Sequence, residues 1–296
     1  MSGGTERKTT DRTDLDPQGP PESERSRALT DKGFPAEEID TSRPHPARMY
    51  DYYLGGKDNY EADREAAEMV IHMTPDARPS ARANRDFMQR AVRYAAGQGI
   101  RQFVDIGTGI PTSPNTHEVA RSVVPEARVA YVDNDPIVAA HAGARLTNTG
   151  NAGFFLGDVR EPETILEHAT IRELIDFDEP VALMLVALLH FVRDDEDPAG
   201  IVRTLTKNLP AGSLLILSHG TTDFHRDVDA DAGEAYKNAT STLTLRGKPE
   251  IEPFFEGFSL VEPGLVQVPL WRPDGPLVQE GENVRIAFWG GVGRKG

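Results

Sequence analysis

Residues 102–109 read Gln-Phe-Val-Asp-Ile-Gly-Thr-Gly, an apolar run that ends in the pattern Asp-x-Gly-x-Gly. Further along, residues 131–136 read Tyr-Val-Asp-Asn-Asp-Pro and end a second apolar run. Glycines at the end of a buried strand let backbone N–H groups approach a ligand, because no Cβ is in the way. A carboxylate at the tip of the next strand can accept hydrogen bonds from the two hydroxyls of a ribose. Together the two runs predict a binding site for a nucleoside cofactor.

Strand-like and helix-like patterns alternate from residue 101 onward. The strand patterns cover 101–106, 128–133, 153–157, 181–189 and 213–218. The helix patterns cover 115–123, 136–147, 161–175 and 196–208. A strand–helix repeat at this spacing predicts an α/β fold with a doubly wound, mostly parallel sheet and helices on both faces. Within it, Asp135 is expected to cap a helix that begins at Pro136.

The C-terminal part shows a different pattern. Helix-like stretches at 228–241 and 249–257 precede two strand patterns, 259–268 and 284–290. Two closing strands joined by a loop rich in proline and glycine predict a hairpin that adds an antiparallel edge strand. With the five strands before them, they make the expected sheet seven-stranded.

The chain before residue 100 divides into two parts. Residues 1–40 are rich in Ser, Thr, Pro, Gly and charged residues without apolar periodicity, so we expect a disordered tail. Residues 41–99 carry apolar side chains at helical spacing, broken at Gly55 and Gly56. They predict an N-terminal helical extension that forms a cap and lid. A single domain is therefore expected over 41–296, with its core over 100–296.

Composition excludes several classes of site and partner. The net charge of −15 gives a surface that repels phosphate backbones and anionic lipid, so we expect neither a nucleic acid nor a membrane as partner. The chain has no cysteine, which excludes disulfides, thiolate nucleophiles and cysteine zinc sites. The histidines form no metal pattern, and no metal is expected. Without a secretory pattern or an apolar run long enough to span a bilayer, the chain is expected to be cytoplasmic.

The glycine loop indicates which nucleoside binds. A dinucleotide fingerprint reads Gly-x-Gly-x-x-Gly, but Thr112 stands where its third glycine belongs, and Pro111 and Pro114 crowd the loop. Asp105 would place a negative charge near a pyrophosphate. The same charge suits a ligand with an ammonium group, such as the amino acid end of S-adenosylmethionine.

The third strand pattern also ends in an acid, Asp158. A carboxylate at that tip can accept the exocyclic amine of adenine, while the next backbone N–H, that of Val159, donates to a ring nitrogen. The alternative is that Asp158 only caps a helix that starts near Glu161.

These features resemble the class I S-adenosylmethionine-dependent methyltransferases, and more closely the actinobacterial S-adenosyl methyltransferase family once catalogued as a domain of unknown function. The resemblance covers 43–293, and its most distinctive runs are Tyr-Leu-Gly-Gly-Lys-Asp-Asn at 53–59 and Asp-Ile-Gly-Thr-Gly-Ile-Pro-Thr at 105–112. Further matching stretches are 43–52, 83–85, 131–136, 188–191 and 217–220.

The resemblance implies a Rossmann-like methyltransferase domain that uses S-adenosylmethionine. It implies that Asp105, Gly107 and Gly109 hold the methionine moiety. Asp133 would bind the ribose. The adenine would be bound by Asp158 and Val159 and flanked by Asn134.

The remaining candidates lie outside the strand tips that bind the cofactor. The Gly55-Gly56 loop is expected to turn over the ligand, with Lys57 reaching the methionine carboxylate and Asn59 beside it; the alternative is an ordinary turn with solvated charges. His190 follows the fourth strand pattern, where a histidine can act as a general base, although a lone histidine is more often structural. Tyr50 and Tyr53 are the other candidates for handling a proton.

Three functions are compatible with these features. The favoured one is a methyltransferase, a transferase that acts on a small-molecule methyl acceptor. The second is a nicotinamide-dependent reductase, against which the missing third glycine argues. The third is a sensor that binds S-adenosylmethionine without catalysis, because residues 188–191 read Leu-Leu-His-Phe and carry no amino-methylation signature.

Overall fold

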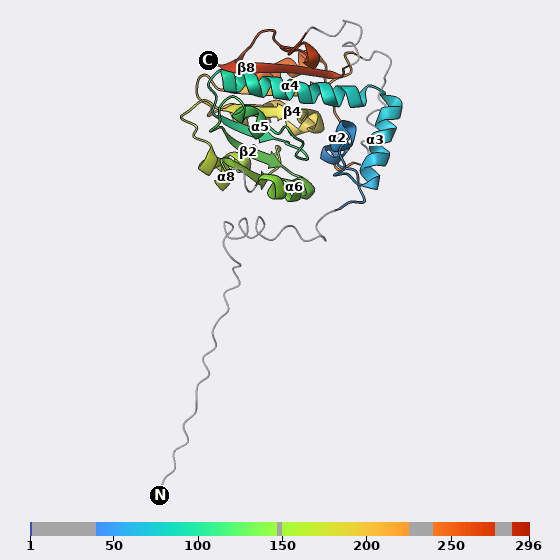
Figure 1. Ribbon diagram of the computed structural model, residues 1–296, viewed down its shortest axis with the longest axis horizontal. Coiled ribbons are helices and arrows are strands. Elements are labelled where there is room, and N and C mark those ends of the chain that lie inside the picture. Colours follow the sequence, from blue (N-terminus) through green and yellow to red (C-terminus); the bar gives the residue numbers. More distant parts are fainter. Residues whose placement is uncertain (2–39, 147–149, 225–238, 276–285) are drawn as a thin grey trace. The chain divides into compact units, whose positions relative to one another are not determined.

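The computed structural model describes Met1 and residues 40–146, 150–224, 239–275 and 286–296 (Figure 1). The tail expected over 1–40 lies almost wholly outside the described residues. So do most of the helix-like stretch 228–241 and the start of the strand expected at 284–290.

Within the described residues, eight strands form one sheet in the order β3-β2-β1-β4-β5-β8-β6, and β7 also pairs with β8. Their bounds are β1 Gln102–Ile106, β2 Arg128–Asp133, β3 Ala152–Leu156, β4 Ala182–Val186, β5 Leu214–Gly220, β6 Phe258–Leu260, β7 Val266–Gln267 and β8 Phe288–Lys295. The first five strands are parallel, and β8 runs antiparallel to β5 and to β6. The expected mostly parallel sheet is confirmed. The strand order reverses direction between β1 and β4, which is where ligands bind in such sheets.

The C-terminal strands are antiparallel as predicted, but their bounds and order differ from a simple edge hairpin. β8 lies inside the sheet, between β5 and β6, and it continues to Lys295, past the expected end at 290. Residues 290–293 read Gly-Gly-Val-Gly, which weakens the strand pattern. The glycines are needed because a Cβ on Gly293 would lie 2.8 Å from the Cβ of Phe258. The strand expected over 259–268 is split into β6 and β7 by a turn in which Gly264 has a φ of +90°.

The α-helices are α2 Pro46–Leu54, α3 Glu61–Met73, α4 Ala77–Gly97, α5 Thr116–Arg121, α6 Pro136–Leu146, α7 Pro162–Glu167, α8 Ala169–Leu174, α9 Pro198–Thr206 and α11 Lys248–Ile251. Short 3-10 helices are η2 Leu189–Phe191, η3 Asp194–Glu196, η4 Glu252–Phe255 and η5 Val268–Leu270. The predicted cap of α6 is confirmed, since the Ile137 N–H donates to Asp135 Oδ1 at 2.9 Å. The helix expected over 161–175 is two helices, because extended backbone at His168 separates α7 from α8.

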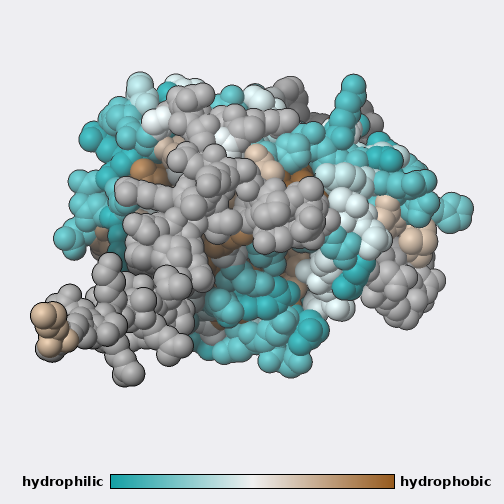
Figure 2. Space-filling model, turned by 90° about the horizontal axis from the view of Figure 1, so that it is seen from below, coloured by the Kyte–Doolittle hydropathy of each residue, from teal (hydrophilic) through white to brown (hydrophobic). Residues whose placement is uncertain are grey.

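Two apolar cores lie on opposite faces of the sheet, because successive strand residues point to alternate sides. Val104, Leu183 and Leu215 belong to the core that includes residues of α7, α8 and α9. Phe103, Met184 and Ile216 belong to the core that includes residues of α4, α5 and α6. This arrangement confirms the doubly wound fold. Among the residues that carry a hydropathy colour in Figure 2, hydrophilic ones predominate and hydrophobic ones show only in small areas.

The N-terminal helices differ in where they pack. The α4 helix lies along the sheet and contributes Phe87 and Val92 to one of its cores. The α2 and α3 helices lie beyond the sheet (Figure 1), where Met49, Tyr53 and Val70 form a separate small core. This places α2 next to the strand ends that carry the expected site. None of the described helices is both long enough and apolar enough to cross a membrane.

Candidate functional site

A cavity of about 410 Å³ lies at the carboxyl ends of the parallel strands. Its volume is in the range of small-molecule sites. Residues after β1, β2, β3 and β4 form one wall, and residues of α2 and α4 line it as well. Seven of the residues predicted to bind the cofactor line this cavity: Asp105, Gly107, Gly109, Asp133, Asn134, Asp158 and Val159.

The turn after β1 needs both of its glycines. Gly107 has a φ of +73° and Gly109 a φ of +68°, a region that side chains rarely adopt. The Gly107 and Thr108 N–H groups donate to the Val132 carbonyl, at 2.8 and 3.2 Å, which fixes the turn against β2. A Cβ on Gly107 would also lie 2.6 Å from Leu188 Cδ1.

Asp133, at the end of β2, ties this turn to the next strand. Its Oδ2 accepts from the Gly109 N–H at 2.8 Å, and its Oδ1 accepts from the Asp135 N–H at 3.0 Å. Burial raises the pKa of Asp133 to about 6, in spite of these two bonds. The carboxylate is therefore held rigidly, with lone pairs left for a ligand on the cavity side.

Asp105 lies within β1 and is also buried. Its Oδ2 accepts from the Thr116 hydroxyl at 2.6 Å. Burial raises the pKa of Asp105, although this hydrogen bond and the charge of Arg85 act in the opposite direction. A carboxylate in such a place is stabilised by a cationic ligand group.

Arg85, on α4, is a cavity residue that the sequence reasoning did not assign. Its Nη2 donates to the carbonyls of Thr112 and Pro114, the latter at 2.9 Å, so the guanidinium lies against the loop that follows the glycine turn. Its Nε is buried and has no hydrogen-bond partner among the described residues. A buried donor without a partner points to a missing acceptor. The only available sequence signal was the Ala83-Asn84-Arg85 stretch within the resemblance.

Asp158 follows β3 and does not cap a helix with its side chain. Its Oδ2 accepts from Asn134 Nδ2 at 3.1 Å, and its Oδ1 accepts from the Arg160 backbone N–H at 2.9 Å. Burial alone would raise the pKa of Asp158, but these bonds and the Arg160 charge lower it. The α7 helix starts later, with Glu161 at its N-cap, so the capping alternative does not describe this residue.

The structure does not bring Lys57 and Asn59 to the cavity. Lys57 is exposed, and Asn59 donates from Nδ2 to Asp51 Oδ2 at 2.8 Å. The Asp58 N–H donates to the same oxygen at 3.0 Å. These bonds fold the glycine loop back onto α2, as in the ordinary turn that was the alternative. Arg85, and not Lys57, is the cation beside the predicted methionine site.

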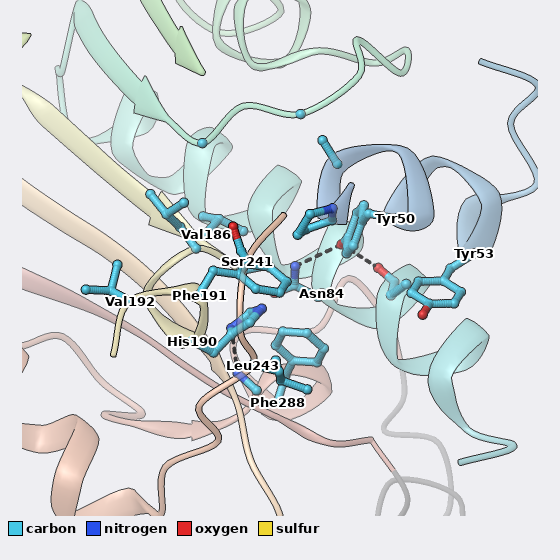
Figure 3. A pocket seen from close by; sticks show the side chains of 18 of the residues that line it. Tyr50, Tyr53, Asn84, Val186, His190, Phe191, Val192, Ser241, Leu243 and Phe288 are labelled. Atoms are coloured by element: carbon cyan, nitrogen blue, oxygen red, sulfur yellow. Dashed lines mark hydrogen bonds between the residues drawn. The ribbon is translucent and has the colours of Figure 1, made fainter. Parts of the chain in front are cut away.

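The three predicted proton-handling residues, Tyr50, Tyr53 and His190, all line the cavity (Figure 3). The Tyr50 hydroxyl donates to the Ala81 carbonyl at 2.9 Å and accepts from Asn84 Nδ2 at 2.9 Å. Asn84 Oδ1 in turn accepts from the Ser218 hydroxyl at 2.5 Å. This chain of bonds connects α2, α4 and β5, so it holds the cavity wall in one arrangement.

His190 lies on η2 because β4 ends earlier than predicted. The strand stops at Val186, and Ala187 has a φ of +54°, which turns the chain into η2. The His190 Nδ1 accepts from the Gly220 N–H at 3.2 Å. His219 does not line the cavity: both of its ring nitrogens are bonded, to the Gly220 carbonyl at 2.7 Å and to Arg246 at 3.0 Å.

Comparisons with known proteins show which family the chain belongs to. A family model described as S-adenosyl methyltransferase matches residues 32–296. A crystal structure of a DUF574 family protein from Streptomyces avermitilis is 46% identical, with a TM-score of 0.83, and the match covers 88% of this chain and 100% of that one. A protein from Thermobifida fusca, described as a candidate methyltransferase, is 41% identical with a TM-score of 0.83, over 88% of this chain and 98% of that one. A search of curated proteins found no match.

The family model spans nearly all of the described residues, and the two similar structures come from actinobacteria. The chain belongs to the S-adenosyl methyltransferase family and is an S-adenosylmethionine-dependent methyltransferase.

Proposed function

We propose that this enzyme methylates a small molecule, which binds in the part of the cavity between α2, α4 and η2. The observation that carries the proposal is that one cavity joins a charged wall at the strand tips to a wall of Tyr50, Tyr53, Phe191 and Phe288 (Figure 3). A cofactor and an acceptor can thus lie side by side in it. A cytoplasmic location is part of the same proposal.

The charged and polar groups that line the cavity fit S-adenosylmethionine. We assign the ammonium group to Asp105 and the carboxylate to Arg85, whose buried Nε has no other acceptor. Asp133 is assigned to the ribose hydroxyls. The adenine is assigned to Asp158, the Val159 N–H and Asn134. The bound cofactor supplies an electrophilic methyl group on a sulfonium.

The protein itself contributes the positions of the two reactants. The glycine turn and Asp133 hold one reactant, while the Tyr50–Asn84–Ser218 chain holds the opposite wall. Alignment of two reactants in one site is a large part of the rate enhancement that such an enzyme can provide.

Calorimetry and turnover together test the proposal. Titration of S-adenosylmethionine into the protein is expected to give a saturable heat, and titration of NADH none. Incubation with radiolabelled S-adenosylmethionine and a small-molecule extract should transfer label to a small-molecule fraction. Binding without transfer to any fraction would favour the sensor, and binding of NADH alone would favour the reductase.

Substitution of Arg85 tests the assigned carboxylate contact. We expect Arg85→Gln to weaken S-adenosylmethionine binding by about tenfold, because a charge-assisted hydrogen bond is lost. The exposed Arg82 on the same helix gives a control, Arg82→Gln, that should bind normally. Decarboxylated S-adenosylmethionine should bind equally well to the wild type and to Arg85→Gln. An equal loss for both ligands would instead mean that Arg85 acts only by supporting the loop.

The affinity is also expected to depend on pH. Asp133 has a pKa of about 6 in the free protein, and its ionised form is the better acceptor for two ribose hydroxyls. Below this pKa the carboxyl must release a proton to bind, so affinity falls as the pH falls. Calorimetry should show about tenfold weaker binding at pH 5 than at pH 7. Asp105, whose pKa is also raised, should add to this fall in affinity. The substitution Asp133→Asn should remove the contribution of Asp133 to the pH dependence.

A further inference from the structure

The charges that line the cavity are unevenly distributed. Among the described lining residues, the acids are Asp105, Asp133 and Asp158, all at strand ends. The arginines are Arg85, against the loop after β1, and Arg160, which pairs with Asp158 at 3.1 Å. The part of the wall that faces the acceptor is formed by aromatic, aliphatic and neutral polar side chains (Figure 3). Arg160 is already bonded to Asp158, to Glu196 and to the Phe191 carbonyl, and Arg85 is assigned to the cofactor carboxylate. A carboxylate bound in this part of the cavity would therefore lose its hydration without gaining an unpaired cation.

His190 lies in the same part of the described wall as Tyr50 and Tyr53, and its hydrogen bond determines where its proton lies. The Gly220 N–H donates to Nδ1, so Nδ1 must carry a lone pair. Burial lowers the pKa of His190 well below 6.5, and His219 and Arg246 behind it lower it further, so the ring is neutral. A neutral ring with a bare Nδ1 carries its hydrogen on Nε2.

This tautomer makes Nε2 a donor toward the cavity. Among the described residues Nε2 has no hydrogen-bond partner, whereas Nδ1 accepts from the Gly220 N–H. Figure 3 shows the His190 ring in the cavity wall, with Asn84 and Tyr50 labelled in the same view. A general base would need a lone pair on Nε2, which would place the hydrogen on Nδ1, directly against the Gly220 N–H. Tyr50 is not a base either, because its own hydrogen is donated to the Ala81 carbonyl.

Neither His190 nor Tyr50 can thus remove a proton from the acceptor, and this restricts the nucleophile. An aliphatic hydroxyl is too weak an acid to ionise without a base. A neutral amine has one lone pair, and accepting a bond from Nε2–H would occupy the pair that must attack the methyl group. A phenolate oxygen has several lone pairs, so it can accept from His190 with one of them and attack with another.

We propose that the acceptor is an aromatic molecule, uncharged apart from an acidic phenol-type hydroxyl, whose oxygen accepts a hydrogen bond from His190 Nε2–H. The phenol releases its proton to water. Its oxygen then forms a bond to the methyl carbon while the carbon–sulfur bond breaks, and the electron pair of that bond goes to sulfur. The products are an aryl methyl ether and S-adenosylhomocysteine. The proposal rests on the proposed function, and it makes His190 a residue that positions the acceptor and not the general base expected from the sequence.

Binding of small probes to protein saturated with S-adenosylhomocysteine tests the acceptor class without turnover. We expect 4-chlorophenol to bind about fivefold tighter than chlorobenzene, the gain of one neutral hydrogen bond. The anion 4-chlorobenzoate should bind at least about tenfold more weakly than 4-chlorophenol, because Arg160, the arginine beside Phe191, is already paired with Asp158 and Glu196, and Arg85 is assigned to the cofactor carboxylate. Benzoate binding as tight as phenol binding, or no binding of the phenol, would overturn the proposal.

Two variants of His190 test the hydrogen bond itself. The preference for 4-chlorophenol over chlorobenzene should disappear in His190→Leu and persist in His190→Gln, whose amide can still donate. Each variant is first checked for normal binding of S-adenosylhomocysteine, which reports that the fold is intact. An unchanged preference in His190→Leu would contradict the assigned contact. If that variant does not fold, the three probes on the wild type still decide the acceptor class.

The pH dependence of kcat/KM distinguishes the two sources of the nucleophile. For a set of 4-substituted phenols of different acidity, the inflection should move with the pKa of each phenol. With S-adenosylmethionine saturating at every pH, so that the Asp133 titration does not enter, an inflection at one pH for every phenol would reveal a base in the enzyme and overturn the proposal. The absence of any methyl ether, in protein that binds S-adenosylhomocysteine, would overturn it too. Failure to bind S-adenosylhomocysteine at all would instead contradict the proposed function.

Discussion

Asp133→Ala is expected to weaken the binding of S-adenosylmethionine by about a hundredfold or more. The carboxylate is assigned to two ribose hydroxyls, and a hydrogen bond to a charged group contributes about 1.5–3 kcal/mol. The substitution also removes the bond from the Gly109 N–H, 2.8 Å long, that holds the glycine turn. Calorimetric titration of the wild type and the variant measures the difference.

A change in stability would complicate that comparison, but we expect Asp133→Ala to change the free energy of unfolding only slightly. The pKa of Asp133 in the folded protein, about 6, is above its ordinary value of 3.8, so the folded state binds this proton more tightly than the unfolded state. Stability therefore falls as the pH rises from about 4 to about 6, and the buried charge costs on the order of 3 kcal/mol at pH 7. Alanine relieves that cost and loses two hydrogen bonds, effects of similar size.

An exposed acid provides the matched control for Asp133. Asp178 lies in the loop before β4, at the other edge of the sheet, and Asp178→Ala should bind S-adenosylmethionine as the wild type does. Wild-type affinity in Asp133→Ala, with the fold intact, would show that the ribose assignment is wrong.

Gly56→Ala is expected to destabilise the protein by about 2–4 kcal/mol. A Cβ at this position would lie 2.0 Å from Asp51 Oδ1 and 2.5 Å from Oδ2, so the Asp51 side chain must move. It would then lose the bonds from the Asp58 N–H and from Asn59, and a buried carboxylate would be left without partners. Chemical denaturation measures the change in the free energy of unfolding.

Substitution of the neighbouring Gly55 distinguishes the effect of this side-chain clash from the effect of backbone strain. Gly55 has a φ of +83°, but a Cβ there would meet no atom within 4 Å, so Gly55→Ala should cost only about 1 kcal/mol. Because α2 carries Tyr50 and Tyr53 into the cavity, Gly56→Ala should also weaken 4-chlorophenol binding more than S-adenosylhomocysteine binding. Equal destabilisation by the two substitutions would mean that Asp51 does not anchor the loop.

Local patterns were sufficient to predict the parallel part of the sheet. The strands β1 to β5 and the helices between them follow from alternation of apolar runs with helical spacing, and each is encoded by consecutive residues. The strand-tip residues Asp105, Asp133 and Asp158 could also be found, since parallel strands bring their carboxyl ends to one edge. The order of the C-terminal strands could not be predicted. Three glycines weaken the strand pattern of β8, and the need for two of them appears only in the fold, where Phe255 and Phe258 pack against Gly291 and Gly293.

The sequence alone thus determined the fold class, the family and the acid-tipped edge where the cofactor is assigned. Only the tertiary structure decided which cation lies beside that edge and what His190 can do. Arg85 reaches carbonyls at 112 and 114, the Ser218 hydroxyl reaches Asn84 across 134 positions of the chain, and Gly220 sets the tautomer of His190 from 30 positions away. Such bonds form between residues that only folding brings together, and no local spacing encodes them.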